Sequence, residues 1–172
     1  MRTRLRSFAW LIIVTAAIAS SCVGGPHILS GHGTFIAVTG QCCRAQPHNG
    51  VDFGGGFGAP VLAAAGGRVV RAGTMGPQCG VGVSIRHAFG LNTAYCHFST
   101  VAVERGATVT RGQPIGTIGV SGDYGGVTHV HLMPGVNADL DPMQYMVGCY
   151  EPGVEYPTEK IVLTYPVACR NR

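Results

Sequence analysis

Residues 48–73 read HNGVDFGGGFGAPVLAAAGGRVVRAG, and this stretch sets the predicted fold class. Short apolar runs rich in valine alternate with glycine clusters, which is typical of strands separated by turns. We predict one strand over residues 48–53, and a hairpin-like unit formed by residues 60–63 and 68–71 around Gly66 and Gly67. The whole chain holds 27 Gly and 10 Pro among 172 residues, and helical spacing is scarce. An all-β domain is the expectation.

The same reading extends along the rest of the chain. We expect a first strand over residues 34–38, a hairpin of residues 81–86 and 92–98, a strand over 127–132, a short helix over 143–147 and a last strand over 161–165. There is also a weak internal echo, since residues 58–70 and 106–116 each read as strand, glycine turn, strand.

Two histidine motifs point to a metal. His48 and Asp52 lie four residues apart, and His129 and His131 lie two apart in an apolar run about eighty residues later. Imidazole and carboxylate ligands together suit Zn²⁺, and three protein ligands plus a water is the composition of a catalytic zinc site. Each motif alone is weak, and the competing interpretation is that these are scattered core or surface histidines.

The spacing of the motifs constrains their geometry. In a strand, His129 and His131 share one face while Val130 points into the core, so one histidine can ligate while the other stands beside the water. Four residues of straight strand cover roughly 13 Å, too far for His48 and Asp52 to share one ion. Because the glycines here disfavour a helix, we predict a bulge or bend near Gly50, where the missing side chain also leaves room for the ion.

The N-terminus has the pattern of an export signal. Arg2, Arg4 and Arg6 precede the apolar run of residues 8–19, which is too short to span a bilayer as a mature helix. Cleavage after Ala19 or Ser21 would give a secreted or periplasmic protein, and cleavage before Cys22 would give a lipid-anchored one. An uncleaved membrane anchor is the third interpretation.

The predicted domain organisation follows from these limits. We assign residues 1–21 to the signal peptide, 22–33 to a short linker, 34–148 to one domain and 149–172 to a tail. Without the signal, nine basic residues face eight acidic ones, a net charge of about +1. This balance argues against a nucleic-acid-binding domain, so we expect no nucleic-acid partner. We also expect the protein to be a monomer.

The cysteine count fits an oxidising compartment. Six cysteines remain when Cys22 is set aside, and an even number in an exported chain predicts disulfides. Cys79 and Cys96 bracket the predicted hairpin, and Cys149 and Cys169 bracket the tail, so we expect these two pairs first. A structural zinc site made by Cys42, Cys43, Cys96 and a histidine is the competing interpretation.

With these motifs in view, the chain resembles the lysostaphin and LytM type of zinc endopeptidases over residues 33–142. Residues 48–73 resemble the family's H-x-G-x-D segment and the G-x-P-V-x-A stretch after it, and residues 80–99 (GVGVSIRHAFGLNTAYCHFS) resemble its Y-x-H-L-S hairpin. Residues 103–122 (VERGATVTRGQPIGTIGVSG) and 128–134 (THVHLMP) resemble its G-Q-x-I-G segment and its H-L-H-F-E strand. The ordered set is far more specific than any one motif.

The resemblance implies roles for five residues. His48, Asp52 and His131 match the zinc ligands, and His97 and His129 match the pair beside the activated water. It also implies a mainly β, compact antiparallel domain with a duplicated barrel-sandwich hybrid motif and a groove over the metal. The implied substrate is the peptide part of bacterial peptidoglycan. His87 matches no ligand, and we expect it beside the ligands or at the surface.

Two departures and two rival functions remain open. Thr128 replaces the usual proline, and Leu132-Met133-Pro134 replaces the Phe-Glu pattern. Neither departure removes a ligand or a catalytic histidine, and both lie at the floor of the implied groove. We therefore expect them to affect specificity more than activity. A lipoyl or biotin carrier needs a lysine at a hairpin tip, but the only lysine is Lys160 in the tail. A non-catalytic cell-wall binding or regulatory module would be expected to lack some of the five residues, and here all are present.

Overall fold

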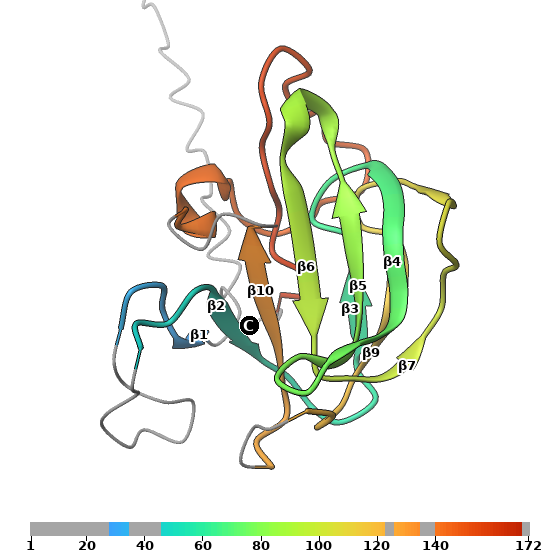
Figure 1. Cartoon of the computed structure of the whole chain (residues 1–172). Coiled ribbons are helices and arrows are strands. Elements are labelled where there is room, and N and C mark those ends of the chain that lie inside the picture. Colours follow the sequence, from blue (N-terminus) through green and yellow to red (C-terminus); the bar gives the residue numbers. More distant parts are fainter. Residues whose placement is uncertain (1–27, 35–45, 123–125, 135–139, 170–172) are drawn as a thin grey trace, which may run out of the picture.

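The structure, a computed structural model, describes residues 28–34, 46–122, 126–134 and 140–169. A seven-stranded sheet has the order β1 (Ile28–Ser30), β2 (Val51–Gly54), β10 (His129–Pro134), β6 (Asn92–Cys96), β5 (Gly80–Arg86), β4 (Gly67–Gly76) and β8 (Thr108–Val109). A three-stranded sheet has the order β3 (Pro60–Leu62), β9 (Pro114–Ile118) and β7 (Phe98–Val101), and lies against the larger sheet (Figure 1). Neighbouring strands in both sheets are antiparallel, which confirms the predicted fold class.

The hydrophobic core lies on one face of the larger sheet. Alternate residues of its strands are fully buried there, including Val130 and Leu132 of β10 and Ile85 of β5. They belong to the same buried cluster as Ile115 and Ile118 of β9 in the smaller sheet. Since strand side chains alternate between faces, the residues between these, such as His129 and His131, lie on the opposite face.

The internal echo corresponds to a reciprocal exchange of strands. The first repeat contributes β3 and β4, and the second contributes β8 and β9. β3 pairs with β9, and β4 pairs with β8, so the first strand of each repeat pairs with the second strand of the other. This arrangement agrees with the duplicated motif that the resemblance implies.

The predicted hairpin around Gly66 and Gly67 is wrong. β3 and β4 lie in different sheets, and the residues between them, Ala63, Ala64 and Ala65, are buried in the core. A glycine turn signals a change of direction but does not distinguish a hairpin from a crossing between sheets. The predicted hairpin of residues 81–86 and 92–98 is confirmed as β5 and β6, whose register pairs Val83 with Tyr95, but β6 ends at Cys96 and Phe98 begins β7 in the smaller sheet.

His87, at the end of this hairpin, is buried rather than close to the ligands. Its Nδ1 lies 2.9 Å from the Gly66 carbonyl oxygen, and its Nε2 lies 2.7 Å from Thr93 Oγ1. Thr93 also lies within 3.0 Å of the Tyr95 hydroxyl, which the backbone N–H of Ala64 contacts at 2.9 Å. His87 is therefore part of a buried polar network on the core side.

The C-terminal residues pack on the core instead of hanging from it. Leu163 is fully buried, and the backbone N–H of Leu62 donates to the Pro166 carbonyl at 2.8 Å. The predicted strand over residues 161–165 is wrong, because only an isolated bridge between Met146 and Leu163 forms. The predicted helix is a 3₁₀ helix, η2 (Pro142–Tyr145). Asp141 caps its first turn, because the carboxylate of Asp141 accepts a hydrogen bond from the backbone N–H of Met143.

Part of the predicted linker is also a strand. Residues 28–30 form β1, which pairs with β2, so they extend the larger sheet; three residues are too short a run to show a strand pattern in sequence. The signal peptide and most of the strand predicted over residues 34–38 lie outside the described residues. Within the described part, no helix is long and apolar enough to cross a bilayer.

Both expected disulfides are present. Cys79 is bonded to Cys96, and Cys149 is bonded to Cys169, which joins the end of the tail to its first residue. Because Cys96 is in a disulfide, it is not a ligand of the alternative structural zinc site. Cys22, Cys42 and Cys43 lie outside the described residues.

Candidate active site

The larger sheet brings the two histidine motifs together on the face opposite the core. His131 of β10 is the register partner of Asp52 on β2 and of Cys96 on β6. His97 directly follows β6, and His48 lies in the segment before β2. Antiparallel pairing thus gathers all five predicted residues, and all five are buried.

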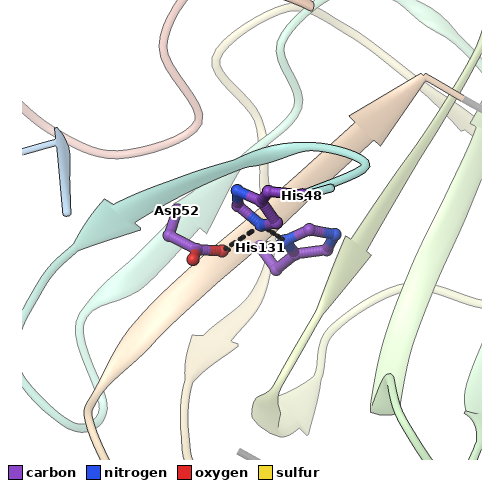
Figure 2. Close-up of side chains that lie close together, drawn as sticks. All are labelled: His48, Asp52 and His131. Atoms are coloured by element: carbon purple, nitrogen blue, oxygen red, sulfur yellow. Dashed lines mark hydrogen bonds and ion pairs between the residues drawn. The ribbon is translucent and has the colours of Figure 1, made fainter. Parts of the chain in front are cut away.

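His48, Asp52 and His131 point at one another (Figure 2). Asp52 Oδ1 lies 2.8 Å from His131 Nδ1 and 3.3 Å from His48 Nε2, and the two nitrogens are 2.9 Å apart. Three tetrahedral ligands at about 2.0–2.1 Å from Zn²⁺ would be roughly 3.3 Å apart. The observed triangle is slightly tighter than this, and it fits three ligands of one small ion.

A bend at Gly50 allows His48 and Asp52 to converge, as predicted. A Cβ atom added at Gly50 would lie 2.7 Å from His131 Cε1 and 2.9 Å from its Nε2, and it would also collide with the Leu132 carbonyl oxygen. The missing side chain therefore makes room for the His131 ring, rather than for the ion alone.

Hydrogen bonds fix which nitrogen of His48 faces the cluster. Its Nδ1 donates to the Gly31 carbonyl at 2.9 Å and lies 3.2 Å from Ser30 Oγ. A neutral imidazole with its proton on Nδ1 has a lone pair on Nε2, the atom that faces Asp52 and His131. Sequence reasoning missed this contribution of β1, because its only signal is the run Ile28-Leu29-Ser30.

Asp52 is held in its charged form. Burial alone raises the pKa of Asp52, but hydrogen bonds and charge interactions with His131 and His48 outweigh burial and place the pKa well below its ordinary value. Burial lowers the pKa of His131, against the opposing effect of Asp52. A carboxylate oxygen and two imidazole nitrogens thus meet within hydrogen-bond distance. A divalent cation can bind a lone pair of each of the three atoms, so that no proton has to be shared among them.

His97 and His129 stand beside this cluster. Their ring centroids are 4.7 Å apart, the His97 ring is 6.0 Å from that of His131, and His129 Nε2 lies 3.6 Å from Asp52 Oδ1. His97 Nδ1 donates to the Ser121 carbonyl at 2.7 Å, and His129 Nδ1 donates to the Val127 carbonyl at 2.8 Å. An imidazole that donates from Nδ1 has, in its neutral form, its lone pair on Nε2.

His97 is kept neutral and in an unusual backbone conformation. Burial lowers the pKa of His97 to about 4, although the hydrogen bond to Ser121 opposes this. The φ of His97 is 68°, in the left-handed region that few non-glycine residues adopt. Such conformations persist only where surrounding contacts impose them, and they cluster at functional sites.

A cleft of about 580 Å³ opens beside the cluster. Its lining includes Asn49, Gln78, Cys96, His97, His131 and Met133. The cleft contains two of the five predicted residues, so a molecule bound in it can reach the histidines.

Comparison with known proteins agrees with this geometry. The model of peptidase family M23 matches residues 46–142, and the chain belongs to this family. The chain is 42% identical over 89 residues to the peptidoglycan DD-endopeptidase ShyA of Vibrio cholerae. The aligned segment covers 52% of this chain and 20% of that protein. It is 33% identical over 132 residues to the lipoprotein NlpD/LppB homolog of Pseudomonas aeruginosa, which covers 77% of this chain and 43% of that protein.

Solved structures give the same result. The catalytic domain of the antimicrobial peptidase lysostaphin from Staphylococcus simulans superposes with a TM-score of 0.61 and 28% identity, over 70% of this chain and 91% of that domain. The chain spans only about a fifth of the length of ShyA and less than half that of the lipoprotein.

Proposed function

We propose that this chain is a zinc-dependent endopeptidase that hydrolyses peptide bonds in the stems or cross-bridges of bacterial peptidoglycan. The observation that carries the proposal is the convergence of His48 Nε2, Asp52 Oδ1 and His131 Nδ1 beside an open cleft, with two further histidines next to them. Membership of peptidase family M23 and similarity to a peptidoglycan endopeptidase support the substrate class.

Zinc is the metal that this donor set favours. Two neutral imidazoles and one carboxylate leave a net positive charge on Zn²⁺, and three protein ligands are typical of a catalytic rather than a structural site. His48, Asp52 and His131 would hold the ion. When bound, it would supply Lewis-acid chemistry by polarising a peptide carbonyl and increasing the acidity of water.

His97 and His129 provide the proton transfers. Each imidazole has its proton on Nδ1, held by a backbone carbonyl, and therefore has an Nε2 lone pair that can accept a proton from the attacking water. The ring that has accepted this proton can hydrogen-bond the developing oxyanion through Nε2–H and then transfer the same proton to the leaving amine. General acid–base assistance of this kind is worth roughly 10²–10⁴ in rate.

We further propose that the protein is exported and acts as a monomer at the cell envelope. The N-terminal pattern and the similarity to a lipoprotein support export, either as a secreted or periplasmic protein or with a lipid anchor at Cys22. A peptidoglycan peptide is the partner, and the small net charge gives no support for nucleic acid.

The metal content of the purified protein tests the proposal first. A chain that begins after residue 21, prepared without chelators, should contain one zinc per molecule by elemental analysis. His131→Ala and Asp52→Ala should lose tight zinc binding, whereas His97→Ala and His129→Ala should retain it and lose most hydrolysis. A metal-free wild-type protein that still folds would favour the non-catalytic binding or regulatory module.

A further inference from the structure

The cleft beside the metal ligands continues across the outer face of the larger sheet. A second depression of about 440 Å³ shares Met75, Cys79 and Met133 with the cleft. A third, of about 370 Å³, shares Val70 and Arg86 with the second. Together the three form one furrow that begins at the candidate active site and ends among arginines.

The register of the strands defines the floor of this furrow. Met133 on β10 faces Ala94 on β6, Ala94 faces Ser84 on β5, and Ser84 faces Arg71 on β4. The side chains between Met133 and Arg71 are small, and Ala94 and Ser84 are buried beneath the surface. The floor is therefore low between the active site and the arginines.

The next row along the same strands adds more positive charge. Asn92 on β6 faces Arg86 on β5, and Arg86 faces Arg68 on β4. Adjacent strands are about 4.8 Å apart, and residues two apart on one strand are about 6.7 Å apart. Along these steps, the backbones of Arg71 and Arg86 both lie roughly 16 Å from that of His131. An extended peptide covers this distance in about five residues, and in fewer once the length of an arginine side chain is included.

The arginines at this end of the furrow are not neutralised. Arg68, Arg71, Arg86 and Arg105 are all exposed, and within the described residues none forms an ion pair with a carboxylate. The Arg71 guanidinium donates to the Thr74 carbonyl at 3.3 Å. Like charges directly opposite one another in a sheet are destabilising. The pairing of Arg68 with Arg86 therefore lowers the stability of the fold, and folding does not explain why both residues are arginine.

We propose that Arg71 and Arg86 form a carboxylate-binding subsite that determines which peptidoglycan stems the enzyme cleaves. The guanidinium group donates in a planar fork that matches a carboxylate, and charge-assisted hydrogen bonds of this kind are among the strongest. The subsite selects stems with a free carboxylate about three to five residues from the scissile bond, and discriminates against stems in which that group is an amide. This inference rests on the proposed endopeptidase function.

The test compares two substrates that differ in one group. Cross-linked stem peptides are synthesised with either a carboxylate or a carboxamide at the position in question, and kcat/KM is measured for the zinc-loaded enzyme. Charge-assisted hydrogen bonds predict that the wild type prefers the carboxylate by about 10- to 100-fold. Arg71→Gln/Arg86→Gln should remove this preference, mainly through KM, while its kcat/KM on the amide stays within about twofold of the wild type.

Lys160→Gln is the control for loss of positive charge outside the furrow: it removes one charge, where the double variant removes two, and lies in the tail. It should retain the full preference. The Tm of Arg86→Gln should stay the same or rise, since the like-charge pair with Arg68 is removed. A double variant that keeps the preference, or a wild type that prefers the amide, would overturn the proposal.

Direct binding separates this inference from the proposed function. If the wild type cleaves neither peptide, the endopeptidase assignment fails, and fluorescence polarisation with the same two labelled peptides still tests the subsite. Preferential binding of the carboxylate that is lost in the double variant would support it. Equal binding of both peptides, or tighter binding of a phosphate-bearing polymer at the same two arginines, would contradict it.

Discussion

Cys79 is disulfide-bonded to Cys96, and its carbonyl oxygen accepts a 3.0 Å hydrogen bond from the backbone N–H of His97. One cysteine is therefore covalently bonded to the residue before His97 and also contacts His97 itself. Both constraints act on a residue whose φ is 68°. The disulfide thus holds a proposed catalytic histidine in a backbone conformation that it would otherwise rarely adopt.

Removal of this disulfide should reduce catalysis more than zinc binding. The cysteines are 17 residues apart, and chain-entropy estimates for a loop of that size give about 3 kcal/mol of stability. We expect Cys79→Ala/Cys96→Ala to lose stability and hydrolysis but to retain zinc, because neither cysteine is a ligand. Thermal melts, zinc content and turnover below the Tm measure the three properties.

The second disulfide provides the control. Cys149→Ala/Cys169→Ala opens a loop of similar size, since these cysteines are 20 residues apart, but it lies in the tail. It should lose comparable stability while its folded fraction hydrolyses substrate at the wild-type rate. Equal losses of turnover in both double variants would contradict a specific role for Cys79 and Cys96.

Gly50→Ala should weaken the metal site. The new methyl group would lie within 3 Å of the His131 ring, so the ring or the bend must shift. We expect zinc affinity, measured by competition with a chelator, to fall by at least tenfold. Gly56→Ala is the control, because a Cβ there meets no atom within 4 Å, and it should bind zinc as the wild type does. Equal affinity in both variants would show that the absence of a side chain at Gly50 is not required.

The convergence of the two histidine motifs was predicted from local sequence geometry, whereas the role of His97 was predicted only from the family resemblance. The two-residue spacing of His129 and His131 fixes a shared face in any strand, and the glycine between His48 and Asp52 indicated the bend that joins them. Other parts depend on contacts between distant segments. The Gly31 carbonyl that orients His48 and the Ser121 carbonyl that orients His97 come from segments whose residue types give no sign of this role. An interruption between residues 60–63 and 68–71 was predicted correctly, but Gly67 already belongs to β4, and β3 and β4 lie in different sheets.

Arg111 should be a stability determinant of the whole domain. Its guanidinium donates to the Ala64 carbonyl at 2.6 Å and to the Val162 carbonyl at 3.0 Å, and it stacks 4.3 Å from the centre of the Tyr156 ring. Arg111 therefore links the buried segment between β3 and β4 to the tail. We expect Arg111→Ala to lower the free energy of unfolding by about 2–3 kcal/mol in urea titrations. Lys160→Ala, on the exposed part of the same tail, should change it by less than about 0.5 kcal/mol.

Acid should destabilise the fold in part through His87. Burial lowers the pKa of His87 below its ordinary value of 6.5, although the Gly66 carbonyl opposes this. Below pH 6.5 the unfolded chain therefore binds more protons at this residue, so its contribution to stability is complete above that pH and declines as pH falls toward the folded pKa. His87→Gln should flatten this part of the pH dependence, as followed by urea unfolding at several pH values. An unchanged pH slope in the variant would show that His87 is not a source of it.

The most direct test of the central proposal is hydrolysis of a defined cross-linked peptidoglycan fragment in heavy-oxygen water, with the products read by mass spectrometry. The zinc-loaded wild type should generate one new amino end and one new carboxyl end for each peptide bond cut, with one heavy oxygen in the carboxyl group. The chelated wild type and His131→Ala should generate neither, and His97→Ala should be slower by roughly 10²–10⁴. An intact fragment after incubation with the folded, zinc-loaded wild type, or cleavage that His131→Ala performs equally well, would contradict the account.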